Sequence, residues 1–292
     1  PSTASSSTPD GSFWARGGTS GSGSPAINEG GARSGSKYIT VVNTKNTVNT
    51  SPRTYLTPST PVASSTSYVI QFFCKATDGI NFPNTTIQVG LSSATGTTAA
   101  YKTFVPSGTP STFTKYTVID TSTAAAPSGG FGAIKISSNT ANLAYSMDVD
   151  DWVVYPGIAP DITAPSAPGA VNISDPTGTT LHVNWGAAAD VDGGGYVVIR
   201  YTSNPTGQPD PNVNGIYQVG NTIGTGTVAY VGAATSFIDG GLSNSTTYYY
   251  RVYTADKAFN YSTSVSGSGS TNTTVSVIRY YIDANAGNDN NA

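Results

Sequence analysis

The sequence has few charged residues and almost no cysteine. Charged side chains make up 10% of its 292 residues, against about 25% in an average soluble domain. The net charge of −3 offers no basic face for phosphates, so nucleic acid is not an expected partner. The single cysteine, Cys74, cannot form an internal disulfide, so stability has to come from packing, metals or neighbouring domains.

Long apolar runs and helical patterns are also missing. No apolar run approaches the roughly 18 residues that a membrane span needs, so no transmembrane segment is expected. The chain begins PSTASSSTPDG, without an initiator methionine or a signal-peptide pattern. We therefore expect a mature or excised piece of a longer protein that is secreted or attached to a cell surface, which suits the low charge and the many Gly, Ser, Thr and Asn residues.

Short alternating segments bounded by Gly, Pro, Ser and Asn fill the chain instead. In the first half they include KYITVVN, SYVIQFFCKA, TTIQVGL, FTKYTVID, FGAIKIS and MDVDDWVVY. The period of two predicts strands. Closely spaced prolines predict a linker over residues 159–168, and six or seven further strands follow it. The sequence thus predicts an all-β protein of two tandem β-sandwiches.

Residues 169–275 resemble a fibronectin type III domain, in the form common in secreted proteins of Bacteroidetes-like bacteria. Trp185, at the end of TTLHVNW, matches the buried tryptophan of that family. Leu242 and Tyr248 match its leucine and its tyrosine-corner tyrosine. The resemblance implies a spacer or protein-contact module and brings no catalytic residues.

Two features of this second half lead to further predictions. The segment from Asn204 to Thr227 is longer than the family pattern and rich in turn residues, which indicates an enlarged surface loop. Alternation in TTYYYRVYTAD predicts that one set of side chains packs between the sheets, while Tyr249, Arg251 and Tyr253 are exposed.

Residues 1–158 resemble a β-jelly roll of the carbohydrate-binding-module type. The segments that carry the resemblance are GGARSGSKYITVVN, SYVIQFFCKA and MDVDDWVVY. It implies that the domain binds a polysaccharide or a cell-surface glycan. Such modules stack a sugar ring on an exposed aromatic side chain and bind its hydroxyls with polar groups; the candidates are Trp14, Tyr38, Tyr101, Trp152 and Arg16.

Three carboxylates stand within four positions of the strand MDVDDWVVY. Asp148, Asp150 and Asp151 would repel one another and raise their own pKa values unless a cation or solvent offsets the charge. The resemblance implies a structural calcium ion with Asp150 as the first ligand, Asp148 or Asp151 next, and Glu29 as a contributor. Two other interpretations stay open: exposed acids on an edge strand, or Asp148 and Asp150 as a glycosidase pair.

Residues 276–292 include YYIDANAGNDNN, which resembles the opening strand of pectate-lyase-like right-handed β-helices. The resemblance implies a larger parent protein whose catalysis would lie beyond this chain, so we expect no enzyme within it. Two functions remain. One is a glycan-binding and spacer region; the other is a structural or adhesive stalk or filament of the cell surface, in contact with its own copies or with other surface proteins.

Overall fold

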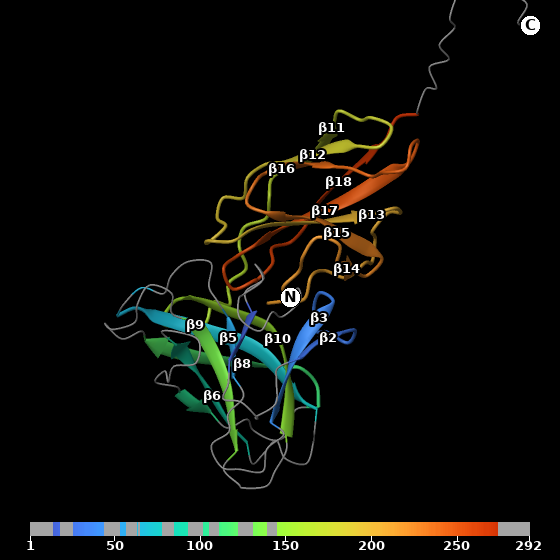
Figure 1. Ribbon diagram of the computed structural model, residues 1–292. Helices are drawn as coiled ribbons and strands as arrows, with labels where there is room; N and C mark the ends of the chain where they lie inside the picture. Colours follow the sequence, from blue (N-terminus) through green and yellow to red (C-terminus); the bar gives the residue numbers. More distant parts are fainter. Residues whose placement is uncertain are drawn as a thin grey trace, which may run out of the picture.

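The computed structural model is built of antiparallel β-sheets (Figure 1). It describes residues 14–17, 26–43, 53–56, 63, 65–77, 85–92, 102–104, 111–121, 131–138 and 145–273. These residues contain no helix, and so none that is long and apolar enough to cross a membrane. The predicted all-β fold class of tandem β-sandwiches is confirmed.

The first sandwich consists of two five-stranded sheets. One has the order β1-β4-β9-β6-β7, with β1 (Trp14–Gly17), β4 (Arg53–Leu56), β9 (Phe131–Ser138), β6 (Thr85–Ser92) and β7 (Lys102–Phe104). The other has the order β2-β3-β10-β5-β8, with β2 (Ala26–Glu29), β3 (Lys37–Asn43), β10 (Tyr145–Pro156), β5 (Ser67–Ala76) and β8 (Thr114–Thr121). Most successive strands from β3 to β10 change sheet, and the exception is the hairpin of β6 and β7 within one sheet.

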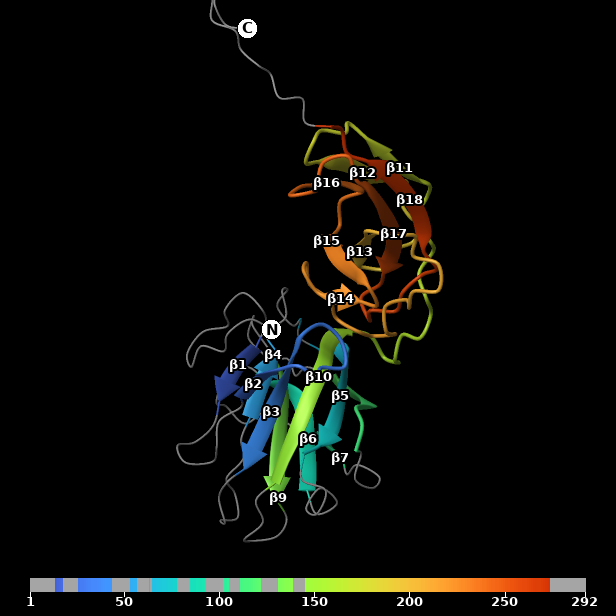
Figure 2. The same cartoon turned by 90° about the vertical axis from the view of Figure 1, so that its right-hand side faces the viewer.

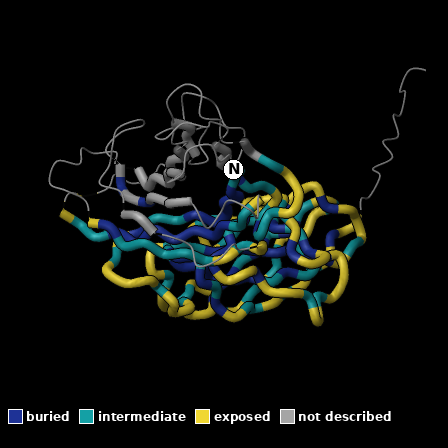
Figure 3. Tube along the Cα trace, turned by 90° about the horizontal axis from the view of Figure 1, so that it is seen from below, coloured by how far each residue is buried: buried dark blue, intermediate teal, exposed yellow. Residues whose placement is uncertain are grey.

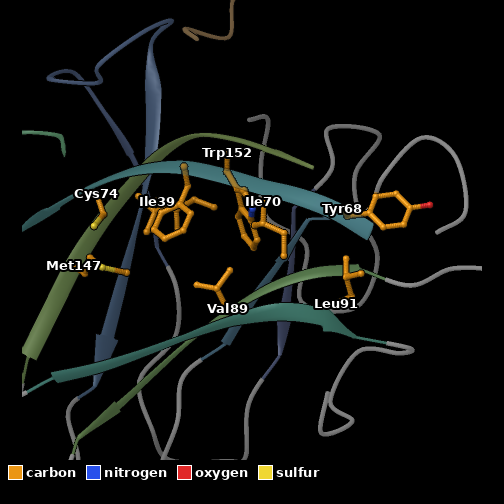
Figure 4. Close-up of a cluster of buried hydrophobic side chains, with 10 residues drawn as sticks. Ile39, Tyr68, Ile70, Cys74, Val89, Leu91, Met147 and Trp152 are labelled. Carbon is orange, nitrogen blue, oxygen red and sulfur yellow. The ribbon is translucent and has the colours of Figure 1, made fainter. Parts of the chain in front are cut away.

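The core of this sandwich follows from strand alternation. On β5 the side chains of Ile70, Phe72 and Cys74 point between the sheets and are fully buried. Figure 4 shows Ile70 and Trp152 directed toward Val89 of the opposite sheet. Cys74 packs as a small hydrophobic residue, as its position in the alternating strand predicts.

A β-bulge interrupts this alternation on β10. The register against β5 shifts between Asp150 and Val153, and Asp151 has a φ of 45°. Val149 before the bulge and Trp152 after it both pack in the core. The extra residue therefore places Asp150 and Asp151 side by side on the other face of the sheet. Since β10 lies between β3 and β5, the edge-strand interpretation of these acids is wrong.

The second sandwich pairs a three-stranded with a five-stranded sheet. The first has the order β11-β12-β16, with β11 (Val171–Ser174), β12 (Leu181–Trp185) and β16 (Ser236–Asp239). The second has the order β14-β15-β13-β17-β18, with β14 (Thr222–Ile223), β15 (Gly226–Gly232), β13 (Gly195–Tyr201), β17 (Thr247–Ala255) and β18 (Val265–Ser270).

This second sandwich has the internal marks of a fibronectin type III-like domain. Trp185 and Leu242 are buried in the core between its sheets. Tyr248 lies at the start of β17, and its Oη accepts a hydrogen bond from the backbone N–H of Ser243 at 2.9 Å. This is the geometry of a tyrosine corner. The predicted roles of all three residues are confirmed.

The long segment 204–227 differs from its prediction as a surface loop. Tyr217 and Ile223 from this segment pack with Tyr253 in a second apolar cluster, on the outer face of the five-stranded sheet. Tyr253 is 0% exposed, so its predicted exposure is wrong, because the inserted segment covers that face. In Figure 3 many of the exposed stretches follow the outer edge of the trace, and buried stretches run through its interior.

The two sandwiches follow one another and meet end to end (Figure 2). The loop between β2 and β3 reaches toward β14 and the segment before it (Figures 1 and 2). Val69 and Tyr155 of the first sandwich pack against Ala258 of the second. Tyr155 Oη also accepts a hydrogen bond from the backbone N–H of Asp161 at 2.9 Å, which ties the connecting segment to β10.

Candidate functional site

The bulge on β10 forms a polar joint with the second sandwich. Arg33, in the loop between β2 and β3, lies 3.4 Å over the ring of Phe73. Its Nη1 is 2.6 Å from Asp151 Oδ2, and its Nη2 donates to the carbonyl of Val213 at 2.8 Å. In return, Asn212 Nδ2 donates to the carbonyl of Arg33 at 2.8 Å. One arginine therefore contacts both domains.

Ser34 and Asp151 extend this joint. The backbone N–H of Ile216 donates to Asp151 Oδ1 at 2.8 Å and to Ser34 Oγ at 2.9 Å. Ser34 Oγ also donates to Asp151 Oδ1. Beside them, Lys115 Nζ of β8 donates to Asn214 Oδ1 at 2.9 Å. Segment 212–216 of the second sandwich is thus hydrogen-bonded to several elements of the first. We call these contacts, together with the residues that make them, the interdomain joint.

Asp150 organises the loop that carries Arg33. Its Oδ2 accepts the backbone N–H of Arg33 at 2.7 Å, and its Oδ1 accepts the N–H of Asp151 at 2.9 Å. Burial, and then the charge of Asp151, raise the pKa of Asp150 to about 7. Burial also raises the pKa of Asp151, while hydrogen bonds from Ser34 and Ile216 and the Arg33 guanidinium oppose the rise. Asp150 therefore titrates near neutral pH, and burial favours the protonated form of both carboxyl groups.

The structure does not bring the four predicted calcium ligands together. Asp148 accepts a hydrogen bond from Thr40 Oγ1 at 2.6 Å and lies 3.4 Å from Lys75 Nζ. Glu29, an exposed side chain, pairs with Lys37 at 2.9 Å. Among the described residues no group of three or more His, Cys, Asp or Glu side chains could hold a metal ion.

The neighbours of the buried acids also have the wrong chemistry for calcium. Asp150 and Asp151 face N–H, O–H and guanidinium donors, whereas calcium requires a shell of oxygen acceptors. The residues as packed do not fit that ion, although calcium binding by the chain stays a prediction. The glycosidase-pair interpretation receives no support either, because Asp148 is 2% and Asp150 5% exposed and both are hydrogen-bonded within the protein.

A second cluster lies on the same outer face of the sheet, next to the joint, since Lys75 of this cluster is two residues from Phe73 on β5. Tyr38 of β3 and Phe113 make an edge-to-face contact with ring centroids 6.1 Å apart. Lys75 Nζ lies 5.2 Å from the Tyr38 centroid and 4.6 Å from that of Phe113. Asn28 Nδ2 donates to Thr40 Oγ1 at 2.6 Å. We call Tyr38, Phe113, Lys75 and Asn28 the aromatic cluster; all four are half-buried.

The other sugar-binding candidates have different outcomes. Trp152 is 2% exposed and packs in the core, so the prediction that it stacks on a sugar is wrong; the bulge directs its indole between the sheets. Trp14 and Arg16 belong to β1, but their side chains lie outside the described part of the structure. Tyr101 lies outside the described residues.

Sequence reasoning missed several residues of these sites. Phe113 precedes β8 directly after the turn-rich segment SGTPST, a position where an aromatic residue is often half-exposed. Lys75 alternates with the core residues of β5, which already placed it on the outer face. Ser34 and Ile216 have no comparable signal, because their contact joins loops far apart in the sequence.

No protein-family model matches the chain, and no curated protein matches it. Among solved structures, the glycoside hydrolase domain of Endo-D from Streptococcus pneumoniae R6 is 10% identical with a TM-score of 0.52; the alignment covers 87% of this chain and 37% of that one. A β-1,2-glucanase from Parabacteroides distasonis is 12% identical with a TM-score of 0.51, over 89% of this chain and 36% of that one. The sixth fibronectin type III domain of a human protein is 18% identical with a TM-score of 0.29, over 41% of this chain and 95% of that one.

These similarities correct one expectation. The sequence led us to expect no enzyme within this chain, but two solved structures that match most of it are glycoside hydrolases. The chain spans little more than a third of each of them. At 10% and 12% identity the likeness establishes the fold alone.

Proposed function

We propose that the chain is the glycan-binding and spacer region of a larger secreted or cell-surface protein that hydrolyses polysaccharides. The aromatic cluster is the observation that carries this proposal. The jelly-roll sandwich presents the cluster, and the fibronectin type III-like sandwich sets its distance from the rest of the protein. The glycoside hydrolases that match most of the chain support a carbohydrate as the partner.

The cluster has the chemistry to hold a sugar. The half-buried rings of Tyr38 and Phe113 lie at 75° to each other, so they offer apolar surfaces in two directions to the C–H groups of a pyranose. Lys75 and Asn28 stand beside these rings with N–H donors for hydroxyl oxygens. Strands β2, β3 and β5 carry Asn28, Tyr38 and Lys75, so three of the four groups come from rigid elements.

Binding of polysaccharides by the full chain tests this proposal. Retention on a panel of insoluble and soluble polysaccharides is compared for the wild type and for Tyr38→Ala and Phe113→Ala. We expect binding to at least one glycan, weakened about tenfold or more in both variants. The control Ile238→Ala, at an exposed site on β16 of the other sandwich, leaves binding unchanged. Equal binding by all four proteins would contradict the proposed role of the cluster.

The interdomain joint favours a second candidate, a structural or adhesive stalk of the cell surface. Direct hydrogen bonds between Asp151, Ser34 and Ile216 fix one sandwich against the other, and a stalk requires such stiffness. In the same polysaccharide experiment a stalk retains no glycan, and its wild type behaves like Tyr38→Ala.

A further inference from the structure

The second sandwich contains a groove of about 500 Å³ on the outer face of its five-stranded sheet. Residues 204–208, at the start of the inserted segment, form one wall, and strands β17 and β18 form the other. Its lining includes Asn204, Gln208, Tyr249, Arg251, Ser266 and Ser268. The volume lies within the range of small-ligand sites, roughly 300 to 1,000 Å³.

The wall of the groove is held in place by the protein itself. Arg251 Nη1 donates to the carbonyl of Gln208 at 3.1 Å, and its Nη2 pairs with Asp210. The Oε1 of Gln208 accepts the backbone N–H of Thr225 at 2.8 Å. These contacts fix residues 208–210 against the sheet, so a ligand would not have to order them.

The opposite wall presents hydroxyl groups in a row. Ser266 and Ser268 of β18 are exposed, and within the described residues their side chains hold no hydrogen bond. Between them Gly267 faces the core, where an added Cβ would lie 2.7 Å from Cγ1 of Val171. The glycine lets β18 approach the other sheet closely, while the two hydroxyls remain turned toward the groove side.

The charge of the lining selects a neutral ligand. It contains no carboxylate, and Asp210 already balances its one cation, Arg251. What remains is hydroxyl and amide groups beside the half-buried ring of Tyr249. Hydroxyl-rich ligands with an apolar ring face match this set.

We propose that this groove is a second carbohydrate site, which binds one or two neutral hexose units of a glycan chain. The ligand class rests on the proposed function, whereas the site itself is separate from the aromatic cluster and belongs to the other sandwich. Tyr249 supplies the stacking surface, and Ser266, Ser268 and Asn204 bind hydroxyls. Arg251 acts as a positioning residue, because it holds the wall and not the ligand.

Amide chemical shifts of the full chain test the site directly. The probes are neutral tetrasaccharides of glucose with β-1,2, β-1,3 or β-1,4 linkages, and of mannose. At least one probe should shift amides of residues 249–251 and 264–268. Ser268→Tyr, which fills the groove from an exposed position, should weaken this binding about tenfold, as should Tyr249→Ala. Ile238→Tyr, an equally bulky change at an exposed site outside the groove, should leave it unchanged.

The outcomes separate this site from the aromatic cluster. Shifts confined to residues around Tyr38, or groove shifts that Ser268→Tyr and Tyr249→Ala leave intact, would overturn the second site. An absence of shifts in the groove with every probe would also overturn it, whatever happens at the cluster. Groove shifts that persist in Tyr38→Ala would support the second site even if the cluster fails its own test.

Discussion

Removal of the Arg33 guanidinium should loosen the interdomain joint. In Arg33→Met the unbranched side chain still covers the ring of Phe73, but the ion pair to Asp151 and the hydrogen bond to Val213 are lost. The Asp151 side chain is 1% exposed, so its carboxylate stays behind without its cation in a buried site. Breaking a buried pair in this way costs about 3 to 5 kcal/mol.

Two features of the joint reduce that cost. The Arg33 side chain is 19% exposed, so water already screens part of the pair. Burial raises the pKa of Asp151, so the stranded carboxyl can take up a proton. We therefore expect a loss of about 2 kcal/mol in the free energy of unfolding at neutral pH. The loss should shrink at acidic pH, where Asp151 is protonated.

Denaturant unfolding and small-angle X-ray scattering of the full chain measure the two consequences. Arg33→Met should lower the free energy of unfolding. It should also increase the radius of gyration and the maximum dimension from scattering, because the sandwiches separate. Arg200→Met is the matched control, because Arg200 pairs with Asp239 at 2.7 Å within a single domain. It should cost comparable stability without a change in scattering.

A double-mutant cycle with Asp151→Asn completes the test. The asparagine carries no charge to strand, so Arg33→Met should cost much less in that background, with a coupling of about 1 to 2 kcal/mol. Additive effects, together with scattering of Arg33→Met that matches the wild type, would refute the assignment of this pair to the joint.

Three more predictions follow from particular contacts. The pKa of Asp150 is raised to about 7 in the fold, so between about pH 4 and 7 the folded state binds a proton that the unfolded state has lost. The free energy of unfolding should therefore fall as the pH rises through this range, and Asp150→Asn should flatten the dependence in a pH series of denaturant unfolding. An added Cβ at Gly269 would lie 2.5 Å from Cγ2 of Ile173, so Gly269→Val should lower the free energy of unfolding by about 1 to 3 kcal/mol. The control Ser266→Val, on the outward face of β18, should lower it much less in the same thermal unfolding experiment. The buried acids have protein partners, so a chelator should leave the melting temperature unchanged. A clear drop in the melting temperature would show that the first sandwich binds calcium.

Local patterns predicted the cores of both sandwiches. Alternation on β5 identified Ile70, Phe72 and Cys74 as core residues, because the two faces of a strand separate apolar from polar side chains. The tyrosine corner was predictable for a similar reason, since its geometry depends only on the few residues from Ser243 to Tyr248.

The candidate site was less predictable because it depends on a bulge and on contacts distant in the sequence. Strict alternation of MDVDDWVVY would place Asp150 and Asp151 on opposite faces and Trp152 on the same outer face as Asp150. The extra residue of the bulge reverses this arrangement after Asp150, so Trp152 enters the core and Asp151 turns to Ile216. Nothing within the strand itself specifies that partner.

The inserted segment 204–227 links the joint to the groove. Its beginning walls the groove, its middle reaches Ser34 and Asp151, and its end forms β14. Tyr217 lies between these parts: its Oη accepts the backbone N–H of Asn212 at 3.0 Å, and its ring packs against Tyr261. Tyr217 and Ile223 of this segment belong to the apolar cluster on the outer face of the sheet, so a shortened segment would remove joint and groove together and expose Tyr253. The insertion therefore combines a fixed orientation, a binding surface and the cover of an apolar cluster in one segment.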